Sequence, residues 1–139
     1  MKIQLTKTAD EHTQTGYQAV LYRKIKDAVE NGTCEEIIAN DCLDFIVERG
    51  GLLQNIIHKM AYNGTLIIYG LNIDQICQQM FCGKLTSAEF NQIMYGNKRQ
   101  SCDSCRGLVI GLESFGLKIL SVRMEDNYYC IKAQRTKNG

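Results

Sequence analysis

Cysteines are the residues whose spacing most directly suggests chemistry in this chain. Cys102 and Cys105 form a Cys-x-x-Cys pair, and Cys77 and Cys82 lie upstream of it. Four thiolates can bind zinc, and a Cys-x-x-Cys pair at a helix start can act as a redox dithiol. Cys77 and Cys82, however, lie roughly 140° apart around a predicted helix, so their thiols would not converge on one metal. Structural thiols are therefore favoured over a dithiol, and no metal site is predicted.

Neither histidine lies beside a nucleophile that a known motif would place there. His12 falls in a polar stretch, and His58 falls on a predicted helix. Catalysis by a histidine needs a reacting group within hydrogen-bond reach of the imidazole. The sequence therefore predicts no catalytic histidine.

The stretch Leu52–Leu71 carries the clearest structural pattern. Its first half has apolar residues at helical spacing, which gives a helix with one apolar face: Leu52, Leu53, Ile56, Ile57 and Met60. Asn63-Gly64 tolerates positive φ and is predicted to end this helix and reverse the chain. Thr65–Tyr69 lacks polar alternation, as expected for a strand covered on both faces in a parallel sheet. A helix that leads into a buried strand is the repeating unit of an α/β fold.

The rest of the chain divides into short elements of the same kinds. Further strands are predicted at 2–5, 17–22 and 36–39, and a short helix at 25–30. Longer helices are predicted at 42–50, 73–83, 86–96 and up to 115, the last capped by Ser101 or Asp103. Gly50-Gly51 would separate the first of these from the helix that begins at Leu52. Two final strands, 117–124 and 128–134, flank a tight turn and predict an antiparallel hairpin.

The composition is that of one globular domain. A chain of 139 residues with 45% hydrophobic content can form one core but is too short for two ordinary domains. Sixteen basic and fifteen acidic residues leave no basic surplus for nucleic acid. The basic run Lys98–Gln100 is accordingly interpreted as a solvated loop.

The sequence predicts a cytoplasmic protein that has no membrane partner. No run approaches the roughly 20 apolar residues that span a bilayer, and the first residues lack the apolar region of a signal peptide. Seven cysteines, an odd number, suit reduced thiols better than a disulfide framework.

A protein partner is predicted from the last strand. Tyr128 and Tyr129 must point to opposite faces of that strand, so one packs inward and the other is exposed. An exposed aromatic residue on an edge hairpin is a feature typical of binding surfaces, so a protein partner or self-assembly is expected.

Three segments carry a resemblance to a known family. They are IIANDCLDFI, LLQNIIHKMAYNGTLIIYG and GLKILSVRMEDNYYCIKAQR. Together with the alternation of strands and helices before a final hairpin, they resemble the class I S-adenosylmethionine-dependent methyltransferases. The resemblance implies an α/β, three-layer Rossmann-like methyltransferase fold, with a mostly parallel sheet that ends in an antiparallel hairpin. It also implies a single domain over residues 1–139.

The same resemblance implies where a cofactor site would lie. In that family the cofactor binds at the carboxyl edge of the sheet, as in other open α/β folds. Asp41 and Cys42 match positions that contact the adenine, and Gly70 lies past the fourth strand of the family's sheet, so these three are the cofactor-binding candidates. Asn72 and Asp74 would be the catalytic candidates in an active enzyme.

Two signatures of the family are missing from this chain. The glycine-rich loop after the first strand is replaced by KTADEHTQTG, whose only glycine is Gly16. The acid that ends the second strand and binds the ribose is replaced by Arg23 and Lys24. Each buried polar group left without its partner costs about 1–3 kcal/mol. Tight binding of S-adenosylmethionine is therefore not expected.

Two functions follow from this pattern. The favoured one is a catalytically inactive methyltransferase-like domain without a cofactor, acting as a structural, assembly or protein-binding subunit of a larger complex such as a viral particle. The alternative is an active small methyltransferase that binds S-adenosylmethionine through a nonstandard loop, with Asp41, Asn72 and Asp74 at its site. A loop Thr6–Gly16 that filled the groove above Asp41 would exclude the cofactor.

Overall fold

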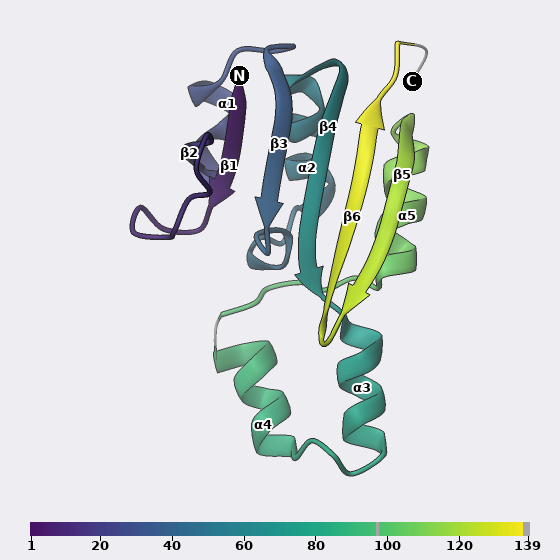
Figure 1. The fold of residues 1–139 in the computed structure, drawn as a ribbon. Helices are drawn as coiled ribbons and strands as arrows, with labels where there is room; N and C mark the ends of the chain where they lie inside the picture. The colour runs from purple at the N-terminus through teal and green to yellow at the C-terminus, as the bar shows by residue number, and fades with distance from the viewer. Residues whose placement is uncertain (97, 138–139) are drawn as a thin grey trace.

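The computed structural model describes residues 1–96 and 98–137. Within them, six strands form one sheet in the order β2-β1-β3-β4-β6-β5 (Figure 1). The strands are β1 Lys2–Thr6, β2 Gln18–Leu21, β3 Cys34–Asn40, β4 Met60–Leu71, β5 Leu117–Glu125 and β6 Tyr128–Arg135. The helices are α1 Ile25–Ala28, α2 Arg49–Lys59, α3 Ile73–Phe81, α4 Ser87–Asn91 and α5 Cys105–Ser114.

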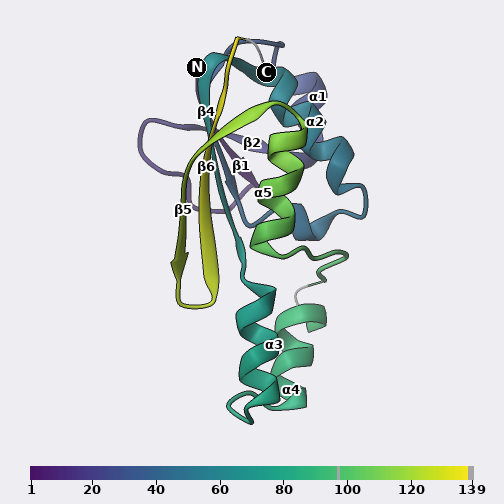
Figure 2. The ribbon, with the colours of Figure 1, turned by 90° about the vertical axis from the view of Figure 1, so that its right-hand side faces the viewer.

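The sheet is mostly parallel and ends in an antiparallel hairpin. Strands β1 to β4 pair in parallel, and β6 runs antiparallel to both β4 and β5. Helices α1, α2 and α5 lie on one face of the sheet, and the loop between β1 and β2 lies on the other (Figure 2). The predicted Rossmann-like methyltransferase fold is therefore confirmed, although the three helices that pack on the sheet all lie on one face and a loop, not a helical layer, lies on the other.

Apolar residues of the central strand β4 are buried on both faces of the sheet, as predicted. Leu66 and Ile68 belong to the main core beneath the helices and are almost completely buried. Ile67 points to the opposite face and packs with Ile38 and Cys130. Opposite orientation of successive side chains is the geometry of a strand, so an unbroken apolar run needs cover on both sides.

Helix α2 has the predicted apolar face but begins earlier than predicted. Leu52, Leu53, Ile56 and Ile57 are all buried in the main core. Met60, the fifth residue predicted on this face, is buried at the start of β4 instead. Gly50-Gly51 lies in the first turn of α2 and does not separate two helices, so that prediction was wrong.

The helix predicted at 42–50 was also wrong. Before α2 begins at Arg49, only a 3-10 turn forms in this segment, over Leu43–Phe45. The backbone carbonyls of this segment accept hydrogen bonds from a distant part of the chain: Asp44 from the amides of Gln100 and Ser101, and Ile46 from the Ser101 hydroxyl. These tertiary hydrogen bonds replace the hydrogen bonds that a helix would make.

Asn63-Gly64 lies inside β4 and does not reverse the chain, so the predicted turn was wrong. Asn63 has the positive φ that the sequence suggests, 67°. The strand is nevertheless continuous from Met60, with an irregularity in its pairing to β3 at this point. A Cβ on Gly64 would lie 2.8 Å from the carbonyl oxygens of Ala61 and Cys34, so the close approach of these backbones requires glycine.

Helices α3, α4 and α5 all begin at side-chain caps. Asn72 caps α3 as predicted, and Thr86 forms a capping box with Glu89 at the start of α4. The residues after α4 form a π-helical turn, Gln92–Gly96. Helix α5 is capped by Ser104, which corrects the prediction of Ser101 or Asp103.

The pairing of Gly70 with Tyr129 provides a test of the fold. Gly70 lies opposite Tyr129 in the β4–β6 ladder, and a Cβ on Gly70 would overlap the ring and hydroxyl of this buried tyrosine. We expect Gly70→Ala to lower the free energy of unfolding by about 1–3 kcal/mol in chemical denaturation.

A matched control for this substitution lies in α5. A Cβ on Gly111 would meet no atom within 4 Å. Gly111→Ala should therefore raise the free energy of unfolding by about 0.5–1 kcal/mol through helix propensity. Equal stability of the Gly70→Ala variant and the unmodified protein would show that Tyr129 does not require glycine opposite it.

Candidate functional site

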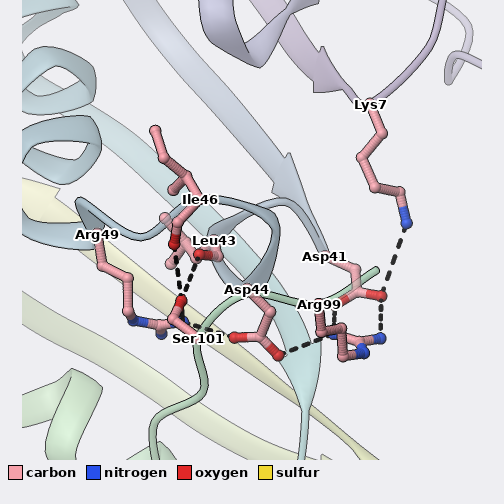
Figure 3. Close-up of polar contacts among 8 residues, drawn as sticks. All are labelled: Lys7, Asp41, Leu43, Asp44, Ile46, Arg49, Arg99 and Ser101. Carbon is pink, nitrogen blue, oxygen red and sulfur yellow. Dashed lines mark hydrogen bonds and ion pairs between the residues drawn. The ribbon is translucent and has the colours of Figure 1, made fainter. Parts of the chain in front are cut away.

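An ion-pair network joins three segments at the carboxyl edge of the sheet (Figure 3). Asp41 and Asp44 follow β3, and Arg99 comes from the connection between α4 and α5. The guanidinium of Arg99 donates to both carboxylate oxygens of Asp41, at 3.0 and 2.8 Å, and to Asp44 Oδ2 at 2.8 Å. Lys7, just after β1, places its ammonium 3.7 Å from Asp41 Oδ2.

The network continues from Asp44 to the start of α2. Arg49 Nη1 donates to Asp44 Oδ1 at 2.5 Å and to the Ser101 hydroxyl at 3.2 Å. The Ser101 hydroxyl in turn donates to the Ile46 carbonyl at 2.8 Å. Each carboxylate oxygen of Asp44 therefore has its own arginine.

The charged side chains of this network are buried, so each needs an oppositely charged partner within the protein. The side chains of Arg99, Asp44 and Asp41 are 4%, 8% and 13% exposed. Burial disfavours the charged form of Arg99, but hydrogen bonds and the charges of Asp41 and Asp44 outweigh it, and the pKa of Arg99 lies above its usual value. Removing one member of such a pair leaves an uncompensated buried charge.

A cavity of about 630 Å³ opens beside this network. Its walls come from the ends of β1, β2 and β3, from the α4–α5 connection and from the β5–β6 hairpin. The lining residues are Lys7, Thr8, Tyr22, Arg23, Asp41, Phe45, Lys98, Arg99, Gln100 and Tyr128. Its volume falls in the range of small-molecule sites, and its position is the one where open α/β folds bind ligands.

Two cationic side chains contact one aromatic ring in the wall of this cavity. The Phe45 ring contacts two cations, with Lys7 Nζ 4.6 Å and the Arg99 guanidinium carbon 5.0 Å from its centre. Such cation–π contacts hold flexible basic side chains against the wall.

The predicted cofactor-binding residues lie in different environments. Asp41 lines the cavity, but its carboxylate is already bound by Arg99. Cys42 is buried in the main core, where burial and then the charge of Asp41 raise the pKa of its thiol to about 12. Gly70 is covered by the ring of Tyr129.

The predicted catalytic residues lie at the start of α3, and neither is among the residues that line the cavity. The Asn72 side chain accepts from the Gln75 amide and donates to the Met124 sulfur, so it caps the helix. Asp74 is exposed in the first helical turn. Catalytic roles for Asn72 and Asp74 stay predictions.

The loop after β1 does not fill the groove above Asp41. It folds back onto the sheet face opposite the helices, where the Gln4 side chain donates to the His12 carbonyl and accepts from the Gln14 amide. Only Lys7 and Thr8 of this loop line the cavity. Arg99 binds both carboxylate oxygens of Asp41, and Lys7 of the loop lies 3.7 Å from one of them.

Sequence reasoning missed the five residues that complete the network with Asp41. They belong to no periodic pattern or catalytic motif: Lys7, Asp44, Arg49, Arg99 and Ser101. One signal was available, because Asp41 and Asp44 are two acids within an otherwise apolar segment, and buried acids need cationic partners.

The cysteines do not assemble into a metal site in the described part of the chain. No group of three or more His, Cys, Asp or Glu residues there could hold a metal ion. Cys77, Cys82 and Cys102 are exposed, and Cys105 is buried in the core.

The described residues include no helix that is long and apolar enough to cross a membrane.

Comparisons with known proteins give matches only at the level of structure. No protein-family model and no curated protein sequence matches the chain. An O-methyltransferase family protein from Burkholderia thailandensis superposes with a TM-score of 0.62 and 16% identity, over 88% of this chain and 37% of that one. A putative S-adenosylmethionine-dependent methyltransferase from Methanococcus maripaludis gives 0.56 and 13%, over 87% of this chain and 55% of that one.

This chain has the class I methyltransferase fold. The same fold is shared by the cyclase SpnF, at a TM-score of 0.59 and 10% identity over 86% of this chain. The chain spans 37%, 55% and 56% of these three proteins. Identities this low establish the fold and leave activity to the residues of the site.

The buried position of Arg99 makes a direct prediction about stability. We expect Arg99→Met to lower the free energy of unfolding by about 3–5 kcal/mol, because Asp41 and Asp44 lose their shared partner. The measurement is urea denaturation, with unfolding monitored by circular dichroism.

The matched control is Arg106→Met at an exposed position in α5. We expect this change to alter the free energy of unfolding by less than about 0.5 kcal/mol. A similar decrease in the free energy of unfolding for the two variants would mean that the ion pairs of Arg99 make no specific contribution to stability.

Proposed function

We propose that this chain is a methyltransferase-like domain that does not transfer methyl groups and serves as a binding or assembly subunit. The observation that carries the proposal is the bidentate pairing of Asp41 with Arg99. The acid that the family resemblance assigns to the cofactor has both of its oxygens bound by a side chain of the same protein.

The charge of the cavity supports the absence of methyl transfer. Four basic side chains and one acidic side chain line it, and the acid is paired. S-adenosylmethionine carries a positively charged sulfonium. Like charges in a partly desolvated cavity repel, so the cavity disfavours this cofactor.

The segments that would contact the rest of the cofactor support the same conclusion. The loop after β1 turns away from the cavity after Thr8, so it offers no cradle of backbone amides. At the end of β2, where an acid would bind the ribose hydroxyls, Arg23 lines the cavity and donates to the Tyr22 hydroxyl at 2.7 Å. A cofactor bound there would leave polar groups without partners.

The alternative, an active small methyltransferase, has one observation in its favour. The cavity lies at the carboxyl edge of the sheet and is large enough for a small-molecule ligand. Asp41, with Asn72 and Asp74, would then contribute to the site only after Arg99 moved away from Asp41.

A binding or assembly role is supported by the exposed side of the hairpin. The edge strand β5 exposes Leu120, Val122 and Met124, and Tyr128 is 44% exposed at the hairpin turn. An edge strand with exposed apolar side chains presents free backbone groups and apolar surface to a protein partner.

Calorimetric titration separates the two functions. We expect neither S-adenosylmethionine nor S-adenosylhomocysteine to bind the chain detectably at about 1 mM ligand. An active S-adenosylmethionine-dependent methyltransferase, titrated under the same buffer conditions, serves as the positive control.

Comparison of the two ligands isolates the effect of the sulfonium charge, because S-adenosylhomocysteine lacks it. Binding of either ligand with a dissociation constant near 1 μM, which corresponds to a binding free energy of about 8 kcal/mol, would contradict the proposal and favour an active enzyme.

A further inference from the structure

The cavity at the carboxyl edge gathers positive charge that the chain as a whole does not have. The whole chain has 16 basic and 15 acidic residues, whereas the cavity is lined by four basic residues and one acidic residue. A local excess of one sign in a concave site focuses its field on a ligand of the opposite sign.

Two of the four cations, Arg23 and Lys98, have no acidic partner among the described residues, and a third, Lys7, shares Asp41 with Arg99. The charge of Arg99 is used by Asp41 and Asp44, whereas Lys7 lies 3.7 Å from an oxygen of Asp41 that Arg99 already binds. Arg23 and Lys98 are exposed at the cavity and form no ion pair with any residue that the structure describes.

These three cations come from different segments. Lys7 follows β1, Arg23 follows β2, and Lys98 precedes Arg99 in the connection to α5. The ion pairs of Arg99 fix the position of that connection, so the burial of Arg99 also determines where Lys98 lies relative to the sheet.

The rest of the cavity is suited to a flat, partly apolar group. Phe45 forms part of its wall, and Tyr128, a residue that is 44% exposed, lines it from the hairpin. A volume of about 630 Å³ is much larger than a single phosphate requires. The ligand therefore has an anionic end and a larger body.

We propose that this cavity binds a small phosphorylated ligand with a ring, of the nucleoside diphosphate class, through Lys7, Arg23 and Lys98. Phosphate oxygens accept charge-assisted hydrogen bonds from these groups, and the ring lies against Tyr128 and Phe45. This inference rests on the proposed non-methylating function, because it assigns the same cavity to an anion in place of a sulfonium cofactor.

Calorimetry with the full chain tests the inference, with ADP, adenosine and inorganic phosphate as probes. At low ionic strength we expect ADP to bind with a dissociation constant below about 100 μM. Adenosine and inorganic phosphate should each bind at least about tenfold more weakly, because each lacks one half of the interaction. Higher salt should weaken the binding of ADP, since exposed charges are screened.

Charge-removing variants locate the site. Arg23→Gln and Lys98→Gln should each weaken ADP binding about fivefold. Lys132→Gln is the matched control, since Lys132 is exposed on β6 and does not line the cavity, and it should leave ADP binding unchanged. Circular dichroism of each variant verifies the fold.

Several results would overturn the inference. They are the absence of ADP binding at about 5 mM, adenosine or inorganic phosphate binding as tightly as ADP, and unchanged binding of ADP by both cavity variants. Absence of binding by ADP and S-adenosylhomocysteine alike would contradict this inference alone. Tight binding of S-adenosylhomocysteine would contradict the proposed function instead.

Discussion

The ion pairs of Arg99 with Asp41 and Asp44 determine the structure of the carboxyl edge. A buried guanidinium between two buried carboxylates has one favourable position, so the α4–α5 connection is fixed against the end of β3. The neighbouring Ser101 donates hydrogen bonds from its hydroxyl and its amide to backbone carbonyls of the segment after β3. These bonds take the place of the hydrogen bonds that a helix in that segment would make. Arg99 thus links the segment after β3 to the α4–α5 connection, and both line the adjoining cavity.

Most of the fold could be predicted from the sequence, because it depends on local patterns. Four features have periodic, capping or turn signals in the local sequence and were predicted from them. They are the apolar face of α2, the buried strand that follows it, the Asn72 cap and the final hairpin. The failures occurred where tertiary contacts replaced local preferences. Asn63 kept its positive φ but within a continuous strand, and the 42–50 segment exchanged helical hydrogen bonds for bonds to Ser101.

The site was less predictable than the fold. Asp41 was singled out through family resemblance, and it does line the cavity, yet its partner Arg99 is 58 residues away in a polar stretch without periodicity. No local rule pairs two such residues. The chain thus has a methyltransferase fold in which the acid at the ligand edge is bound by an arginine of the same protein.

A double-mutant cycle between Arg99 and Asp41 tests this account most directly. The free energies of unfolding of Arg99→Met, Asp41→Asn and the double variant would be measured against the unmodified protein in urea. Because the two groups form a buried bidentate pair, the account predicts a coupling energy of at least about 1.5 kcal/mol, with the double variant less destabilised than the sum of the single ones. Additive effects, within about 0.5 kcal/mol, would contradict it.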